Sequence, residues 1–96
     1  MNYNFEWDPN KARINRRKHG VSFEQAATVF KDPRALSIYD QSHSKGEDRW
    51  MTLGLSAGGG LLVVHHTFEQ RDDSTAQIRI ISGRKATKRE IRQYTE

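Results

Sequence analysis

The sequence predicts a single α+β domain, residues 1–96, in which an antiparallel sheet is accompanied by two N-terminal helices and one C-terminal helix. Three observations predict it. Apolar residues recur at helical spacing after residue 22, and they alternate or run together at strand spacing in four stretches between residues 35 and 82. Capping or turn residues separate these segments. The expected order is β-α-α-β-β-β-β-α, which is typical of an α+β fold.

The first strand and the first helix are expected at the N-terminus. Residues 3–7 alternate aromatic and polar side chains, as in a half-buried strand. Asp8 can cap a helix whose first position is Pro9, because proline lacks only an N–H that has no partner there. Gly20 is a suitable helix end.

A second helix is expected from Ser22, which can form a capping box with Gln25. Asp32 and Pro33 end it. Four apolar residues at i, i+3, i+4 and i+7 form its buried face: Phe23, Ala26, Ala27 and Phe30.

The sheet is expected from four further segments. Residues 35–39 and 50–55 form strands on either side of a polar loop, and glycines 58–60 form a hairpin turn. Residues 61–64 are apolar on both faces, which indicates a central strand. A polar loop, 69–75, leads to the last strand, 76–82. The C-terminal helix then opens with a second capping box, at positions 87 and 90.

The composition favours an anionic partner. Lys and Arg number 16 against 12 Asp and Glu, giving a formal net charge of +4. Arg13, Arg16 and Arg17 share one helix face, which is either a solvated surface or part of a basic binding surface. The absence of cysteine excludes disulfides and thiolate ligands. With no membrane-length apolar stretch and no secretory signal pattern, we expect a cytoplasmic protein that does not bind membranes.

Arg79 is the most informative residue, because it lies among isoleucines in the last strand. A buried charge without a partner costs several kcal/mol, so Arg79 must contact a carboxylate or open onto a cleft. An ion pair with Glu6, Glu24 or Glu47 is the structural alternative to a functional role. Five more cationic side chains follow at positions 84, 85, 88, 89 and 92. Because arginine's planar fork suits phosphate, a phosphate-rich partner is indicated.

The chain has four histidines, and a histidine can transfer protons near neutral pH. His65 and His66 are adjacent in a strand, so they point to opposite faces and cannot both serve one site. The structural alternative is that one of them is a hydrogen-bonded sheet residue and the other is solvated. His19 ends the first helix, where a helix-end hydrogen bond is the simpler role. No role is expected for His43, and no cluster has the spacing of a metal site or the motif of a cofactor site.

Several blocks resemble, in order along the chain, those of one known family. They are Phe5-Glu6-Trp7-Asp8-Pro9 with Lys11 and Asn15; Lys18-His19-Gly20-Val21-Ser22-Phe23; residues 43–49; Leu61-Leu62-Val63-Val64 with His66-Thr67; and Ile78-Arg79-Ile80-Ile81-Ser82 with Arg84. The chain thereby resembles the BrnT toxins of bacterial type II toxin–antitoxin pairs. Two features depart from the family: the doubled histidine at 65 and 66, and a longer loop at 68–74.

The resemblance implies a compact ribonuclease similar to RelE-type toxins. It also implies a cognate BrnA-like antitoxin that inactivates the toxin in a hetero-oligomer, and binding of promoter DNA mainly through that antitoxin. A metal-independent attack by the 2′-OH of RNA would require no cofactor.

The expected site residues follow from this chemistry. Arg79 would stabilise the pentacoordinate phosphorus, His66 would act as acid or base, and His19 would be an alternative proton carrier. The expected RNA-binding residues are Lys18, Arg49, Arg84, Lys85 and Lys88. The alternative reading is a non-catalytic basic module that binds nucleic acid or docks a protein partner.

Overall fold

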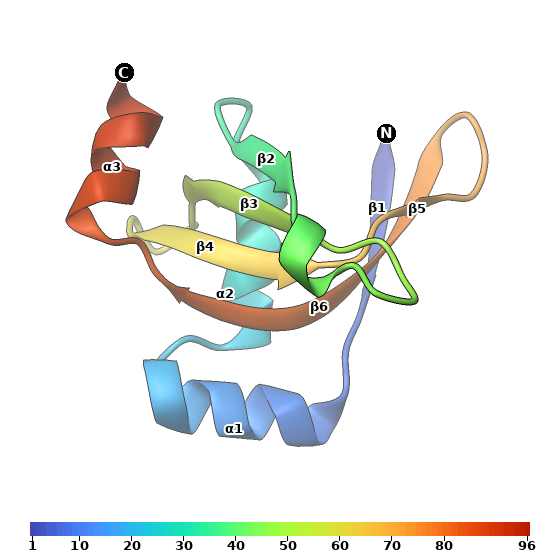
Figure 1. Ribbon diagram of the computed structural model, residues 1–96, viewed down its shortest axis with the longest axis horizontal. Coiled ribbons are helices and arrows are strands. Elements are labelled where there is room, and N and C mark those ends of the chain that lie inside the picture. The colour runs from blue at the N-terminus through green and yellow to red at the C-terminus, as the bar shows by residue number, and fades with distance from the viewer.

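The structure, a computed structural model, describes all of residues 1–96 and confirms the α+β class (Figure 1). Its elements are β1 (Asn2–Glu6), α1 (Pro9–His19), α2 (Phe23–Ala27), β2 (Leu36–Tyr39), β3 (Trp50–Leu55), β4 (Leu61–His66), β5 (Glu69–Gln70), β6 (Thr75–Lys85) and α3 (Lys88–Thr95), with two 3₁₀ turns at Thr28–Lys31 and Gln41–His43. None of the helices has the length and apolar character needed to span a bilayer.

The strands form one mixed sheet in the order β1-β6-β4-β3-β2, with β5 also beside β6. The expectation of a wholly antiparallel sheet is therefore wrong at β1, which runs parallel to β6 with Asn2 opposite Thr75 and Glu6 opposite Arg79. A tight turn imposes antiparallel pairing only on the two strands that it joins. Most of the chain separates β1 from β6, so no turn fixes their relative direction.

The element boundaries largely agree with the sequence pattern. The Asp8 side chain caps α1, Gly20 ends it with a positive φ of 69°, and Thr87 and Glu90 form the predicted capping box of α3. The second helix is shorter than expected, because its last turn tightens into the 3₁₀ turn. The segment predicted as a loop at 69–75 contains the short strand β5, and β6 extends beyond its expected end to residue 85.

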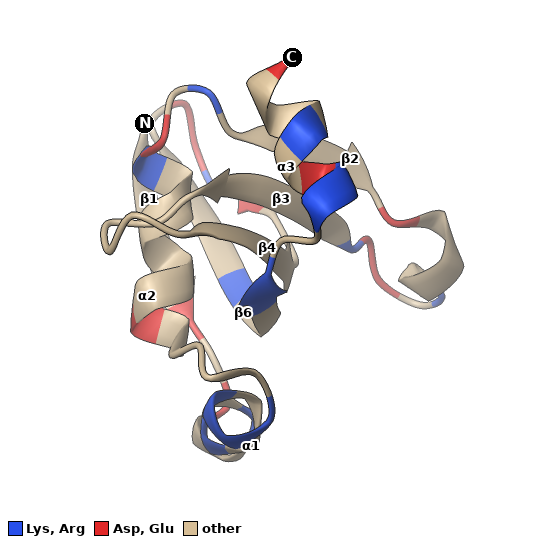
Figure 2. Cartoon of the chain, turned by 90° about the vertical axis from the view of Figure 1, so that its left-hand side faces the viewer, with Lys and Arg blue, Asp and Glu red and all other residues tan.

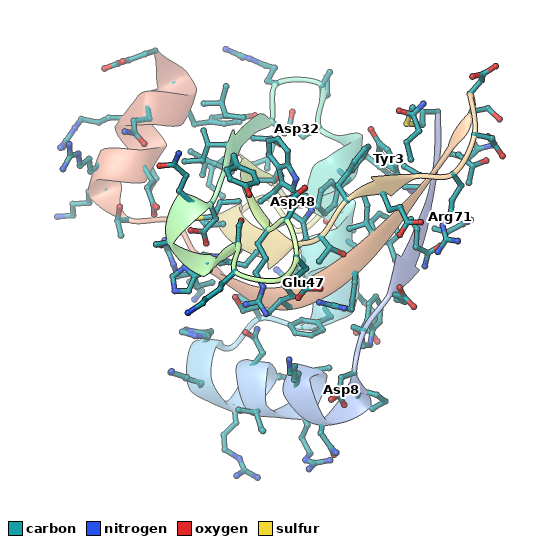
Figure 3. The ribbon with its side chains drawn as sticks, turned by 45° about the vertical axis from the view of Figure 1, so that its right-hand side comes forward. Tyr3, Asp8, Asp32, Glu47, Asp48 and Arg71 are labelled. Carbon is teal, nitrogen blue, oxygen red and sulfur yellow. The ribbon has the colours of Figure 1, made fainter.

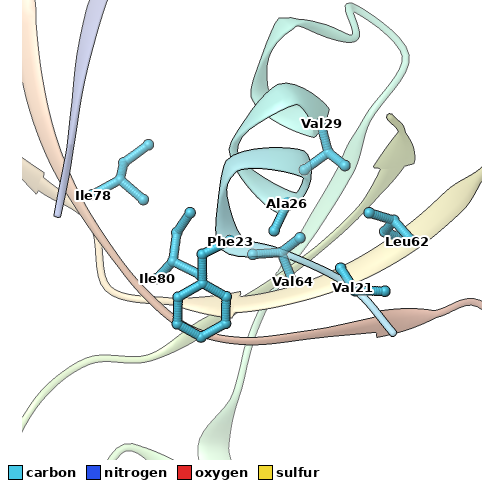
Figure 4. Packing of buried hydrophobic residues seen from close by; sticks show 8 residues of the cluster. All are labelled: Val21, Phe23, Ala26, Val29, Leu62, Val64, Ile78 and Ile80. Atoms are coloured by element: carbon cyan, nitrogen blue, oxygen red, sulfur yellow. The ribbon is translucent and has the colours of Figure 1, made fainter. Parts of the chain in front are cut away.

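The core lies between α2 and one face of the sheet, which we call the inner face (Figure 4). Alternate residues of β6 and β4 point into it, as the period of two requires. Its eight buried members are Val21, Phe23, Ala26, Val29, Leu62, Val64, Ile78 and Ile80. Burying each of the larger side chains contributes about 1.5–3 kcal/mol.

A side-chain amide closes the edge of β6 beyond the end of β1. The Asn15 amide nitrogen donates to the carbonyls of Gly83 and Val21, at 2.8 and 3.0 Å, and its oxygen accepts from the Gly83 N–H at 3.1 Å. Asn15 thus pairs with Gly83 as a neighbouring strand would, and it is buried. A Cβ on Gly83 would lie 3.3 Å from the Ala26 Cβ, so a larger residue would push on α2. This contact fixes α1 against β6.

Replacing Asn15 with alanine should cost about 2–4 kcal/mol of unfolding free energy, because three buried backbone groups lose their partner. Denaturant unfolding followed by circular dichroism measures this. Asn10, exposed at the start of the same helix, is the matched control, and Asn10→Ala should change the free energy by less than about 0.5 kcal/mol. Equal effects of the two variants would show that the edge contact is not stabilising.

Candidate functional site

The face of the sheet opposite α2, which we call the outer face, carries a cluster of ionisable side chains. β6 presents Arg79 and Arg84 there, and β4 presents His65. The loop between β2 and β3 lies over the same face and supplies carboxylates. The cluster consists of Asp40, His43, Glu47, Arg49, His65, Arg79, Ser82 and Arg84.

Two arginines converge on one carboxylate oxygen in this cluster. Arg79 Nη2 donates to Glu47 Oε1 at 2.6 Å, and Arg49 donates to the same oxygen through Nε at 3.3 Å and Nη2 at 3.2 Å. We call Arg49 and Arg79 the arginine pair. Of the three carboxylates expected as partners for Arg79, the structure selects Glu47. The Arg79 side chain is nonetheless 41% exposed, so it also opens onto a cleft.

The cleft beside the arginine pair has a volume of about 310 Å³ and includes Asp8 and Lys11 from the start of α1. Figure 3 shows Glu47 on the loop in front of the sheet, with Asp8 at the start of α1 below it. The hydrogen bond from Arg79 lowers the pKa of Glu47, and the Arg49 contacts act in the same direction. Glu47 therefore stays ionised and holds two like-charged guanidinium groups close together.

A second cleft of about 230 Å³ adjoins the first, since Arg49 and Ile81 line both. Asp40 lines it and is buried. The Asp40 Oδ2 lies 2.9 Å from Nδ1 of His43 and 3.8 Å from Nδ1 of His65. Two imidazoles thus face one carboxylate oxygen.

Arg84 and Glu90 form the other end of the cluster. Arg84 donates from Nη1 and Nη2 to the two Glu90 oxygens, at 2.8 and 3.0 Å. This two-pronged contact is the main cause that lowers the pKa of Glu90 to about 2, and it raises the pKa of Arg84. Because Glu90 belongs to α3, the pair ties α3 to the end of β6.

His66 points away from this cluster, into the inner face. Its ring is 3% exposed; Nε2 lies 2.7 Å from Thr52 Oγ1 and Nδ1 donates to the Thr67 carbonyl at 3.0 Å. The Phe30 ring packs edge-on at 4.7 Å. Burial lowers the pKa of His66 to about 4. The structure therefore does not bring His66 and Arg79 together, and His65 is the histidine of the pair that shares a face with Arg79.

The remaining expected residues lie away from the centre of the outer face, and Lys85, opposite the core residue Leu62, points to the inner face. His19 is half-buried at the end of α1, and its ring makes no hydrogen bond. Lys18 is exposed and, at i+7 from Lys11, lies on the same stripe of α1. Lys85 and Lys88 are exposed where β6 gives way to α3. Figure 2 shows Lys and Arg on α1, the end of β6 and α3.

Four residues of the site were not predicted from the sequence: Lys11, Asp40, His43 and Glu47. Glu47 was expected only as one possible partner of Arg79, not as a carboxylate shared by two arginines. The loop that carries three of them has no periodicity, so only its polar composition signalled it. No three His, Asp or Glu side chains are grouped as a metal site would require.

One comparison with known proteins shows the family of this chain, and another shows a similar fold. A sequence model of the ribonuclease toxins termed BrnT, of type II toxin–antitoxin systems, matches residues 7–90. The 1.1 Å crystal structure of the Brucella abortus ribonuclease toxin BrnT superposes with a TM-score of 0.64 at 22% identity, covering 92% of this chain and 100% of that one. No curated protein sequence matches the chain.

The buried His66 should make folding stability depend on pH. Its pKa is about 4 in the folded protein against 6.5 when solvated, so between these values the unfolded chain binds more protons. Stability is then full above about pH 6.5 and falls as the pH drops, by ~2 kcal/mol between pH 7.5 and pH 5. Urea unfolding at a series of pH values measures the slope. His66→Gln should remove most of it and His65→Gln should retain most of it; an unchanged slope in His66→Gln would refute the assignment.

Proposed function

Because the chain belongs to the BrnT family of ribonuclease toxins of type II toxin–antitoxin systems, we propose that it is a RelE-like endoribonuclease. It cuts RNA on the outer face of its sheet and so inhibits translation. The observation that carries this proposal is the convergence of Arg49 and Arg79 on one oxygen of Glu47 at the edge of a cleft. A phosphate oxygen entering at that point meets two guanidinium groups already held in place.

The proposed reaction uses the 2′-OH of the substrate as its nucleophile. The 2′ oxygen bonds to phosphorus, the bond to the 5′ oxygen breaks, and a 2′,3′-cyclic phosphate and a 5′-OH remain. Negative charge builds up on the phosphoryl oxygens, so the arginine pair stabilises the transition state more than the substrate. The reaction needs positioning, charge stabilisation and proton transfer, and none of these requires a metal ion.

The RNA strand would cross the outer face from α1 to α3. Lys11 and Lys18 lie along one stripe of α1 at one edge, while Lys88, at the start of α3, lies at the other. Lys85 is opposite Leu62 and points to the inner face, so it would reach the strand only where the RNA leaves the sheet. Arg84 is paired to Glu90 and lies close enough to His65 to act on it electrostatically. Its charge would help to attract the RNA backbone to this part of the face. Contacts of this kind hold the backbone without reading sequence.

Two histidines expected to transfer protons are poorly placed for the reaction. His66 uses both ring nitrogens in the core, and its low pKa keeps it uncharged. His19, at the end of α1, makes no hydrogen bond and lines neither of the two clefts. Proton transfer then falls to a group on the outer face.

We also propose a BrnA-like antitoxin as the partner, in a hetero-oligomer that binds promoter DNA mainly through the antitoxin. The family supports a toxin–antitoxin pair. Apolar side chains support a protein contact: Leu36 and Ile38 of the edge strand β2 are 46% and 59% exposed. They border a trough of about 360 Å³ between the sheet and α3, to which α3 contributes Glu90 and Gln93. The apolar face of an amphipathic segment suits this surface.

The purified chain should cut a labelled RNA in the presence of EDTA and leave 2′,3′-cyclic phosphate ends. The assay is run on free RNA and on messenger RNA bound to translating ribosomes. The product ends are identified by mass spectrometry. RNA that stays intact in both settings, yet is bound with a steep salt dependence, would instead identify a non-catalytic nucleic-acid-binding module.

Arg79→Ala should lower the rate of this cleavage by roughly 10²–10³-fold, because one of the two charges at the reacting phosphate is lost. Arg71→Ala is the matched control: Arg71 also pairs with a glutamate, Glu69, but lies on the β5 hairpin away from the cleft (Figure 3). The control should cut at the unsubstituted rate. A loss below tenfold in a folded Arg79→Ala protein would remove Arg79 from the reaction centre.

A further inference from the structure

A buried carboxylate, Asp40, lies beside two histidines on the outer face. The Asp40 side chain is 6% exposed, in a loop where polar side chains are otherwise exposed or half-buried. Its Oδ1 accepts from Ser42 at 3.0 Å, and its Oδ2 faces the two imidazoles. A charge buried on a loop costs stability unless it is compensated, so its position calls for a reason.

One ring nitrogen of His65 faces Asp40, and the other has no partner in the protein. Nδ1 faces Asp40 at 3.8 Å, which is too long for a hydrogen bond but close enough for an ion pair once the ring is protonated. Nε2, on the opposite side of the ring, makes no hydrogen bond to the protein, and the side chain is 26% exposed to the cleft. A neutral imidazole in this setting keeps its proton on Nδ1, next to the carboxylate, and offers the Nε2 lone pair.

His65 lines the same cleft as Arg49, one member of the arginine pair. The cleft that holds His65 shares Arg49 and Ile81 with the cleft that holds Arg79. A bulge contributes to this arrangement: His65 is opposite Ser82 while His66 is opposite Ile80, so Ile81 is the extra residue of β6. Because Arg49 lines both clefts, a phosphate bound by the arginine pair and a ribose in the second cleft would be neighbours.

We propose that His65 is the catalytic base of RNA cleavage, with Asp40 and His43 as positioning residues; the assignment rests on the proposed ribonuclease function. His65 Nε2 takes the proton of the 2′-OH as that oxygen bonds to phosphorus. The bond from phosphorus to the 5′ oxygen breaks with its electron pair, and the departing oxygen takes a proton from water. The protonated ring then forms an ion pair with Asp40 until it loses its proton to solvent.

The surrounding charges favour this role. Burial lowers the pKa of His65 below its ordinary value of 6.5, the charge of Arg84 lowers it further, and Asp40 opposes them. His43 also lowers it and Glu90 raises it, weakly. Asp40 itself stays ionised: burial alone would raise its pKa, but the hydrogen bonds from Ser42 and His43 outweigh burial. His65 is therefore neutral at physiological pH, which is the state a base needs.

The test is the pH dependence of single-turnover cleavage by the full chain, from about pH 4.5 to pH 8. The cleavage rate of the unsubstituted protein should fall toward low pH in one step, the acid limb of the profile. The apparent pKa of this step should lie below the ordinary 6.5 of histidine. His65→Gln should lower the plateau rate by roughly 10²-fold and abolish the limb, while RNA affinity changes less than about twofold. Asp40→Asn should move the limb to lower pH, because the charge that raises the pKa of His65 is gone.

Each result separates the competing assignments. A His65→Gln protein that cuts at the unsubstituted rate, or a limb that disappears in His66→Gln or His19→Gln instead, overturns the role of His65 and leaves the ribonuclease function standing. If the rate of Asp40→Asn falls at the same pH as that of the unsubstituted protein, Asp40 has no part in the mechanism. This result can be obtained even if His65→Gln does not fold. RNA left intact by the unsubstituted protein, on and off the ribosome, overturns the function and the base together.

Discussion

The alternation of side chains along β6 is the constraint on which both the core and the candidate site depend. Ile78 and Ile80 point into the inner face and complete the core, so Arg79 between them must point outward. Beyond Arg79 the strand loses its neighbour β1, and Asn15 takes that place with its side-chain amide. One strand thus anchors the core, α1 and the arginine pair, and a shift of its register by one residue would exchange the core with the site.

Each arginine at the centre of the outer face has a carboxylate partner. Glu47 serves Arg49 and Arg79, and Glu90 serves Arg84. These partly exposed arginine–glutamate contacts contribute little to stability. Their effect is instead to fix long, flexible side chains in one arrangement before RNA arrives, so the reaction does not have to order them. This explains why ionised acids belong in a site that binds an anion.

The sequence was most informative where a local rule had only one solution. The caps of α1 and α3 and the need of Arg79 for a carboxylate or a cleft followed from single residues and their neighbours. The direction of β1 could not be predicted, because it depends on packing between segments more than sixty residues apart. The choice between His65 and His66 also could not be made: both continue an apolar run, and only the register of β4 against β6 decides which faces the core. Asp40 and Glu47 lie in a loop, where no periodicity reports on position.

Nuclear magnetic resonance on arginine side chains tests most directly whether RNA binds the outer face at the arginine pair. The Nε–Hε signals are followed while a 2′-O-methyl RNA, which cannot attack its own phosphate, is added to the protein. The account predicts that Arg49 and Arg79 shift together, as their contact with Glu47 gives way to phosphate, while Arg13 and Arg16 at the separate hollow near α2 stay unchanged. Shifts confined to Arg13 and Arg16, with the arginine pair unmoved, would contradict it.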